Sequence, residues 1–207
     1  MLRVILSVLA VSLFAGDAVA QNYRQAGDWI VRGGIGNTNP DGDGADLNPG
    51  PGKIDVDDAW AVTLTVAYMV TDHIGVELLA SSPFNHDINA TGLGDIGETD
   101  QLPPTLSAQW HFSPIGRIQP YVGAGVNWTI FFNEDTKGAL SSSTLNLEDS
   151  FGLAGQVGFD WHFGNNWLAN FDARYISIES DAELDGSSLG DVEIDPWVLS
   201  LNVGYNF

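Results

Sequence analysis

The sequence predicts an all-β protein, and three observations support that class. Apolar residues alternate with other residues at a period of two in eight separate runs. Such alternation turns successive side chains to opposite faces of a strand. Short and long connections take turns between the runs, which is typical of antiparallel strands arranged up and down. After residue 20, no segment keeps the 3.6-residue period of a helix.

Residues 1–20 differ from the rest and are expected to form a secretory signal peptide. Arg3 supplies a positive start, an apolar run extends from Val4 to Ala15, and Ala18-Val19-Ala20 fits a cleavage site. The run is too short for a membrane-spanning helix, which needs roughly 20 apolar residues. We therefore expect an exported protein whose single domain occupies residues 21–207, with the mature chain starting near Gln21.

The first four expected strands lie near residues 28–36, 59–70, 74–82 and 102–112. The first places Trp29 and Arg32 on opposite faces. The second shows the clearest alternation, with one face formed by Trp60, Val62, Leu64, Val66, Tyr68 and Val70. In the third, Glu77 and Leu79 share a face, and in the fourth the neighbours Trp110 and His111 point in opposite directions.

The last four expected strands lie near residues 119–132, 150–163, 167–178 and 192–207. In the fifth, Asn127 and Trp128 fall on opposite faces. The sixth and seventh carry Asp160, Asp172 and Arg174 on the face away from their aromatic residues. The eighth alternates to the last residue, with an apolar face formed by Trp197, Leu199, Leu201, Val203, Tyr205 and Phe207.

The connections alternate in length. The short ones are residues 71–73, 113–117 and 164–166, and the long ones lie near 37–58, 83–101, 133–149 and 179–191. A bacterial outer-membrane barrel has an even number of strands, short periplasmic turns and long outer loops. Several runs reach the roughly 9–11 residues that cross a bilayer at a tilt, whereas ordinary strands average about 5–6.

The chemistry of the two faces favours lipid outside the barrel. The apolar face carries aromatic residues at strand ends, where side chains of this kind prefer the headgroup level. The opposite face holds charged and amide side chains, and a soluble barrel would turn the apolar face inward instead. The sequence therefore predicts an eight-stranded antiparallel transmembrane β-barrel with short periplasmic turns and long extracellular loops, in the outer membrane of a Gram-negative bacterium. A soluble lipocalin-like barrel is the alternative.

Composition excludes several classes of function. The chain has no cysteine, so it has no disulfide, thiolate metal site or cysteine nucleophile. Its formal net charge of −20 argues against nucleic-acid binding, which needs a basic face. We therefore expect that the protein is not an enzyme and binds no cofactor. His86, Ser81, Ser82 and Asp87 supply parts of a nucleophile–base pair, but the chain has no G-x-S-x-G turn.

Most of the acidic residues lie in or beside the four long connections. Segments this acidic repel one another and stay solvated unless cations screen them. Three interpretations remain open: a high-salt habitat, divalent cations shared with lipopolysaccharide, or attraction of cationic ligands. The stretch "DGDGAD" (41–46) resembles a calcium loop but does not keep the EF-hand register, so no metal site is predicted.

Several stretches resemble the outer membrane protein W (OmpW) family. They are "GVELLASSPFNHDI" (75–88), "LPPTLSAQWHF" (102–112), "PYVGAGVNWTIFF" (120–132), "DSFGLAGQVGFDW" (149–161) and "DPWVLSLNVGYNF" (195–207). The resemblance implies an eight-stranded outer-membrane barrel with a narrow, largely hydrophobic lumen. It also implies passive uptake of small apolar molecules that leave sideways into the membrane. The terminal Phe207 looks like the signature that the barrel assembly machinery reads.

Eight strands enclose an interior that side chains nearly fill, which excludes a wide aqueous pore. We expect a polar plug in the lower lumen formed by Arg32, Glu77, Asp160, Asp172 and Arg174. Among these, Asp160, Asp172 and Arg174 lie on neighbouring strands at spacings where they can meet. An apolar vestibule towards the outer end is expected to contact the ligand through Leu79, Thr105, Phe131, Ala154, Ile176, Ile178 and Val198.

A side opening is expected beside Pro103 and Pro104, because proline donates no hydrogen bond to the ladder. By resemblance, a constriction pairs Leu79 with an aromatic residue on the seventh strand, but that position aligns here with Arg174. The predicted function is a narrow outer-membrane channel for passive uptake of small hydrophobic molecules. The alternative is a structural or adhesion barrel that transports nothing. The expected partners are outer-membrane lipids, lipopolysaccharide and the solutes themselves.

Overall fold

The structure is a computed structural model of the chain. It describes residues 23–40, 45–46, 53–90, 92, 94–138, 141–164 and 166–207. The expected signal peptide and residues 41–44 of the stretch "DGDGAD" (41–46) lie outside the described residues.

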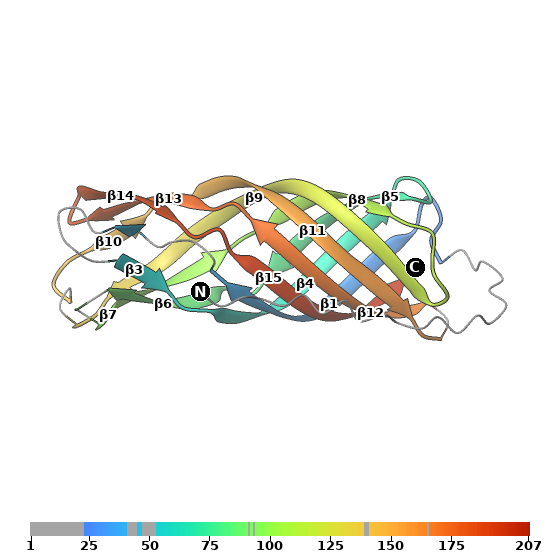
Figure 1. Cartoon of the computed structure of the whole chain (residues 1–207), viewed down its shortest axis with the longest axis horizontal. Helices are drawn as coiled ribbons and strands as arrows, with labels where there is room; N and C mark the ends of the chain where they lie inside the picture. Colours follow the sequence, from blue (N-terminus) through green and yellow to red (C-terminus); the bar gives the residue numbers. More distant parts are fainter. Residues whose placement is uncertain are drawn as a thin grey trace, which may run out of the picture.

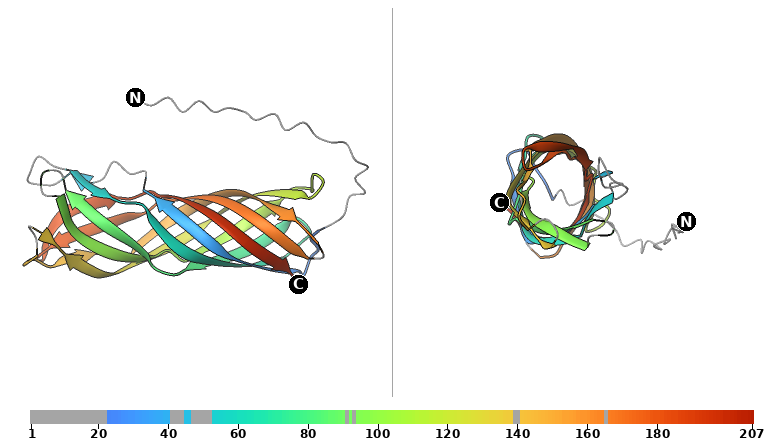
Figure 2. Two further views of the ribbon diagram at one scale, coloured as in Figure 1. Left: turned by 90° about the horizontal axis from the view of Figure 1, so that it is seen from below. Right: turned by 90° about the vertical axis from the view of Figure 1, so that its left-hand side faces the viewer.

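Eight antiparallel strands form a closed barrel (Figures 1 and 2). They are β1 (Trp29–Asn39), β4 (Ala59–Met69), β5 (Ile74–Ser81), β8 (Thr105–His111), β9 (Ile118–Thr136), β11 (Ser150–His162), β12 (Trp167–Ile176) and β15 (Trp197–Asn206). Each strand pairs with the next, and β15 closes the ring on β1 from Ile30↔Asn206 to Asn39↔Trp197. Closure leaves no unpaired strand edge in lipid, where each unsatisfied backbone group costs several kcal/mol. The expected fold class is confirmed.

The described parts of the long connections contain strands that the sequence analysis did not assign. They contain β2 (Ala45–Asp46), β3 (Lys53–Val56), β6 (Phe84–Ala90), β7 (Gly94–Leu102), β10 (Leu145–Leu147), β13 (Glu179–Leu184) and β14 (Ser187–Glu193). These strands prolong the barrel wall beyond its membrane-facing part, at the end opposite the C-terminus (Figure 1). We name them the outer extension. Backbone pairing between neighbouring strands outweighs the mutual repulsion of the acidic side chains.

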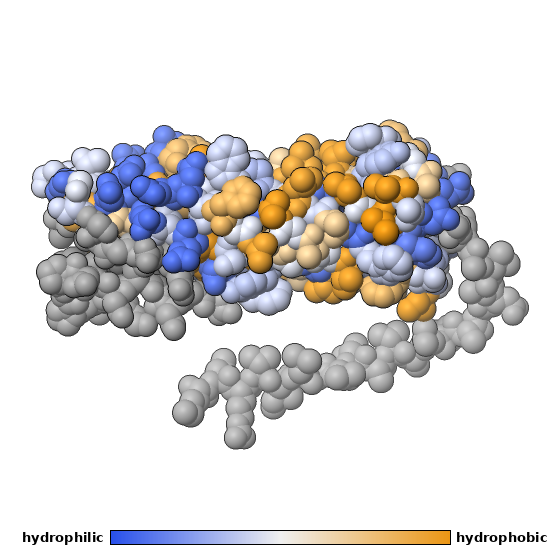
Figure 3. Space-filling model, turned by 90° about the horizontal axis from the view of Figure 1, so that it is seen from above, coloured by the Kyte–Doolittle hydropathy of each residue, from blue (hydrophilic) through white to orange (hydrophobic). Residues whose placement is uncertain are grey.

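The barrel exterior is apolar along the part that carries the eight strands, and polar along the outer extension (Figure 3). Large apolar side chains such as Trp60, Phe151 and Leu201 point outward and are exposed. On β6 and β7 the outward positions are instead polar, as at Asn85, Asp87 and Asp100. An apolar band that ends where a polar rim begins is the outer surface of a membrane barrel. Within the described part of the chain, no helix is long and apolar enough to cross a membrane.

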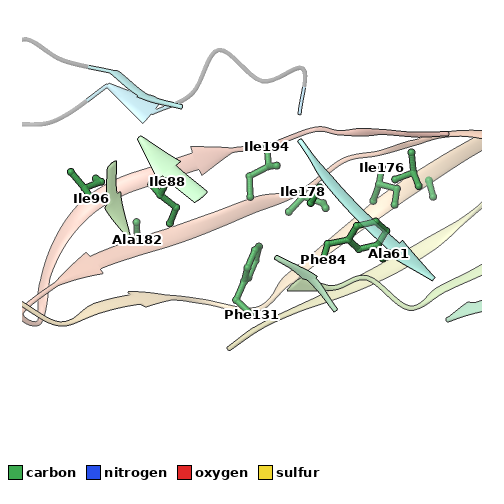
Figure 4. Packing of buried hydrophobic residues seen from close by; sticks show 12 residues of the cluster. Ala61, Phe84, Ile88, Ile96, Phe131, Ile176, Ile178, Ala182 and Ile194 are labelled. Carbon is green, nitrogen blue, oxygen red and sulfur yellow. The ribbon is translucent and has the colours of Figure 1, made fainter. Parts of the chain in front are cut away.

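The barrel interior is divided into three layers along its axis. The outer layer is a cluster of buried apolar side chains around Phe84, Phe131 and Ile178 (Figure 4). The middle layer consists of paired charges, described below. The third layer, towards the periplasmic end, is a second apolar cluster of Ile30, Ala67, Met69 and Leu168. The same end also contains buried polar side chains, among them Gln109, His111 and His162.

Candidate functional site

Glu77 lies at the centre of the charged layer and binds two arginines. On β5 its side chain points into the lumen and is 2 % exposed. Its Oε2 lies 2.9 Å from Arg32 Nη1, and its Oε1 accepts a hydrogen bond of 2.7 Å from Arg174 Nη2. Arg32 comes from β1 and Arg174 from β12, so one carboxylate joins three strands. A buried charge is tolerated when it is paired and hydrogen-bonded in this way.

Asp160 binds Arg32 rather than Arg174, which differs from the pairing expected from neighbouring strands. Arg32 donates from Nε and Nη2 to the two carboxylate oxygens of Asp160, at 3.1 and 2.9 Å. This two-pronged contact is the strong geometry for an arginine–carboxylate pair. Arg24, which precedes β1, also forms an ion pair with Asp160. Sequence reasoning missed Arg24.

Asp172 is held by Arg174 and by a phenol. Arg174 Nε lies 3.5 Å from Asp172 Oδ1, and Tyr121 donates its hydroxyl to Asp172 Oδ2 at 2.7 Å. The Tyr121 ring fits against Gly158 on β11, where a Cβ would overlap the phenol. Glycine at 158 is therefore required for Tyr121 to cross the lumen. The five expected plug residues, with Arg24, form one connected network.

The seven residues expected to contact a ligand are all buried and face the lumen. Relative exposure is 7 % or less for Leu79, Thr105, Phe131, Ala154, Ile176, Ile178 and Val198. Five of these belong to the outer apolar cluster; Leu79 and Thr105 do not. The cluster also contains residues that sequence reasoning assigned to loops: Phe84, Ile88, Ile96 and Ala182 (Figure 4). The alternation in "FNHDI" (84–88) was the available signal for the first two.

Between the outer cluster and the plug, the lumen is almost filled. A cavity of about 10 Å³ is lined by Leu79, Val198 and Arg174, with polar residues from β4, β5, β9, β12 and β15. That is about the space that one water molecule occupies. Arg174 stands beside Leu79 in this wall and is held by Glu77, so a charge closes the position where the resemblance implies an aromatic residue.

Pro103 and Pro104 lie between β7 and β8, inside one long strand rather than at its outer end. On the β9 side the ladder is unbroken, because Pro104 accepts a hydrogen bond of 3.0 Å from the Trp128 amide. On the other side, pairing runs up to Leu79↔Thr105 and resumes at Phe84↔Gln101. The described ladder is thus interrupted between 80–83 and 102–104, as the missing donors of proline predict.

His86 lies in the outer extension, where its ring contacts a backbone carbonyl and an aromatic ring. Its Nδ1 is 2.8 Å from the Asp57 carbonyl, and its ring stacks on Phe84. The Ser82 hydroxyl accepts from the Val62 amide instead of contacting His86. Among the described residues, no group of three or more histidine and acidic side chains could hold a metal ion.

Burial makes His86 a source of pH dependence. Loss of hydration lowers the pKa of the His86 imidazole, although the Asp57 carbonyl opposes this shift. Below about pH 6.5, the histidine of the unfolded chain binds a proton, whereas the buried imidazole of the folded protein stays neutral to lower pH. The stability of the outer extension should therefore fall as pH drops below this value. Hydrogen exchange at β6 and β7 amides, compared at about pH 7.5 and pH 5, measures the change. In His86→Asn the fall should be smaller; an equal fall in both proteins would contradict this assignment.

The polar rim contains a cation surrounded by acids. Lys137 Nζ lies 2.7 Å from Glu98, 3.1 Å from Asp87 and 3.7 Å from Asp95. These carboxylates hydrogen-bond to and surround the amine, which raises the pKa of Lys137 well above its usual value. Lys137 therefore stays charged and ties β6 and β7 to the end of β9.

A closed, apolar-surfaced barrel with a plugged lumen defines an outer-membrane β-barrel protein of a Gram-negative bacterium. Residues 25–207 match the OmpW family, and the chain belongs to it. Outer membrane protein W of Escherichia coli K12 is 41 % identical, and the comparison covers 100 % of both chains.

Two solved structures are similar along almost their whole length. The crystal structure of the outer membrane protein OprG from Pseudomonas aeruginosa has a TM-score of 0.80 and 36 % identity, covering 90 % of this chain and 98 % of that one. The solid-state NMR structure of outer membrane protein AlkL in DMPC lipid bilayers has a TM-score of 0.70 and 29 % identity, covering 96 % and 97 %.

Proposed function

We propose that this protein is a narrow channel for passive uptake of small hydrophobic molecules, which it releases sideways into the outer membrane. The observation that carries the proposal is the outer apolar cluster, whose buried side chains come from β4, β6, β7, β9, β11, β12, β13 and β15. A concave apolar surface with few polar groups suits an apolar ligand. The family resemblance points to the same class of solute.

The plug directs the solute to the side of the barrel. Arg32, Glu77 and Arg174 block the axis with paired charges, which an apolar molecule cannot displace without leaving buried ions unpaired. The interrupted ladder beside Pro103 and Pro104 lies next to Leu79 and Thr105, at the level where the apolar layer ends. We propose this position as the lateral exit.

The surroundings complete the proposal. The exposed acidic rim would share divalent cations with lipopolysaccharide, and the solutes would enter from that side. At the other end, Phe207 is 68 % exposed and donates its amide to the Trp29 carbonyl. Its ring is therefore available to the barrel assembly machinery at the periplasmic end.

A bulky side chain inside the outer cluster should stop uptake. Ala154 faces the lumen opposite Ile176, so Ala154→Trp would fill the route. In vesicles containing this variant, entry of a small alkane should fall close to the rate in protein-free vesicles. Ala173→Trp is the matched control, because Ala173 lies on the neighbouring strand with its side chain towards lipid. Equal uptake by Ala154→Trp and Ala173→Trp would contradict the lumen route.

The alternative is a structural or adhesion barrel that transports nothing. One observation favours it: the cavity above the plug holds only about 10 Å³. The same vesicles separate the two functions. If the unaltered protein admits small alkanes and aromatic hydrocarbons no faster than empty vesicles do, the alternative function stands.

A further inference from the structure

Arg24 occupies an unusual position, because it is not part of any strand and yet is buried inside the barrel. Its side chain is 1 % exposed. Its Nε donates to Gln119 Oε1 at 3.1 Å, and its guanidinium pairs with Asp160. The segment before β1 therefore turns into the periplasmic mouth rather than away from it.

The neighbouring residue anchors the same segment. The Tyr23 ring stacks on His162 with 4.0 Å between ring centroids and 6° between planes. Its carbonyl accepts a hydrogen bond of 3.0 Å from Asn206 Nδ2 on the last strand. Tyr23 and Arg24 are thus held by β9, β11 and β15, and we name these two residues the N-terminal latch.

The formal charges in the lumen are equal only when the latch is in place. Among the buried side chains that the structure describes, the wall supplies three carboxylates, Glu77, Asp160 and Asp172, and two arginines, Arg32 and Arg174. Arg24 is the third cation. Without it, two arginines would face three carboxylates, so the narrow, low-dielectric lumen would carry one excess negative charge even though Asp160 keeps its contact with Arg32. Such a site draws in water and cations, because desolvating an unpaired charge is unfavourable.

We propose that Arg24 is a specificity-determining residue: it neutralises Asp160 and so seals the periplasmic end of the lumen against water and cations. Its importance for solute choice rests on the function proposed above, because a sealed axis leaves only the sideways route. The seal itself is a property of the barrel and is measurable without any solute.

Labelling of a single cysteine tests the seal. The chain has no cysteine, so Leu168→Cys introduces one reporter in the apolar cluster at the periplasmic end. A cationic and an anionic methanethiosulfonate of similar size are each added to the refolded barrel at its periplasmic end. With Arg24 present, both should react slowly. In Arg24→Gln the cationic reagent should react about tenfold faster or more, because the excess negative charge of the lumen concentrates cations. The anionic reagent should react more slowly than the cationic one.

Arg117→Gln is the matched control, since this arginine is exposed in a periplasmic turn and its loss also removes one positive charge. Its labelling should equal that of the Leu168→Cys parent. Adding Asp160→Asn to Arg24→Gln should abolish the preference for the cationic reagent. Slow labelling in Arg24→Gln, or equal acceleration with both reagents, would overturn the proposal. A working seal in a protein that takes up no hydrocarbon would instead refute the proposed function alone.

Discussion

Replacing Glu77 with glutamine should lower the free energy of unfolding by about 3 to 5 kcal/mol, as expected when one partner of a buried ion network is removed. Glu77 receives bonds from both Arg32 and Arg174. A neutral amide of the same shape leaves these two guanidinium groups close together without the charge between them. The measurement is equilibrium unfolding by urea in lipid vesicles, followed by tryptophan fluorescence.

Two further variants separate the loss of charge from a change of shape. Glu98→Gln is the matched control, because Glu98 binds Lys137 at 2.7 Å on the partly exposed rim, where ion pairs contribute little. Adding Arg174→Met to Glu77→Gln removes the excess cation and should recover part of the stability. If Glu77→Gln unfolds at the same urea concentration as the unaltered protein, the charged layer does not hold the strands together.

The arrangement of strands was predictable because membrane barrels impose a strict period on the sequence. On β4, Trp60 and Ala61 fall on opposite faces, and the alternation continues along the strand to Tyr68 and Met69. Lipid selects the apolar face and the narrow lumen selects the other, so the two faces differ along the whole strand. A soluble sheet with one exposed face gives the same alternation with the opposite orientation. The charged residues on the face opposite the aromatic side chains favoured the membrane barrel over the soluble sheet.

The outer extension was not predictable to the same degree, because its alternation is interrupted. Register shifts lie between Ile88 and Asn89 and between Glu98 and Asp100. The first shift adds a residue to β7, where Ile96 and Gly97 are both buried, and the second adds a residue to β9. The exposed positions there are acidic rather than apolar, so the segments read as loops. Burial of Ile96, which lies at the first of these shifts, became visible only once the pairing was known.

The pairing of charges across the lumen depends on distances that no local pattern contains. Arg32 on β1 and Asp160 on β11 are separated by two strands in the wall, β15 and β12. They meet because the barrel is narrow and both side chains are long enough to reach the axis. Sequence reasoning grouped Asp160, Asp172 and Arg174 on two neighbouring strands. Arg174 and Asp172 meet within β12, whereas Asp160 pairs with Arg32. A count of inward charges would have revealed the missing cation, Arg24.

A disulfide across the interrupted ladder should abolish uptake and restore it on reduction. If the β5–β8 register of Leu79↔Thr105 is extended, Ser81 lies opposite Pro103. Directly opposed residues of antiparallel strands lie at about 4.5 to 5.5 Å between Cα atoms, which a disulfide can span. The variant Ser81→Cys with Pro103→Cys contains the only two cysteines of the chain. Oxidised protein should pass small alkanes no faster than empty vesicles, and dithiothreitol should return the rate.

Reversal within one sample separates closure of the exit from damage to the fold, because the same molecules are measured in both states. A second disulfide serves as the control. Ala124→Cys with Gly155→Cys joins register partners in the unbroken β9–β11 ladder, on the lipid-facing side. It adds an equal constraint where no opening is proposed, so oxidation should leave uptake unchanged. Uptake that persists when the disulfide between positions 81 and 103 is formed would show that solutes leave the lumen elsewhere. If either disulfide stops uptake, movement of the whole wall, rather than a local gap, limits transport.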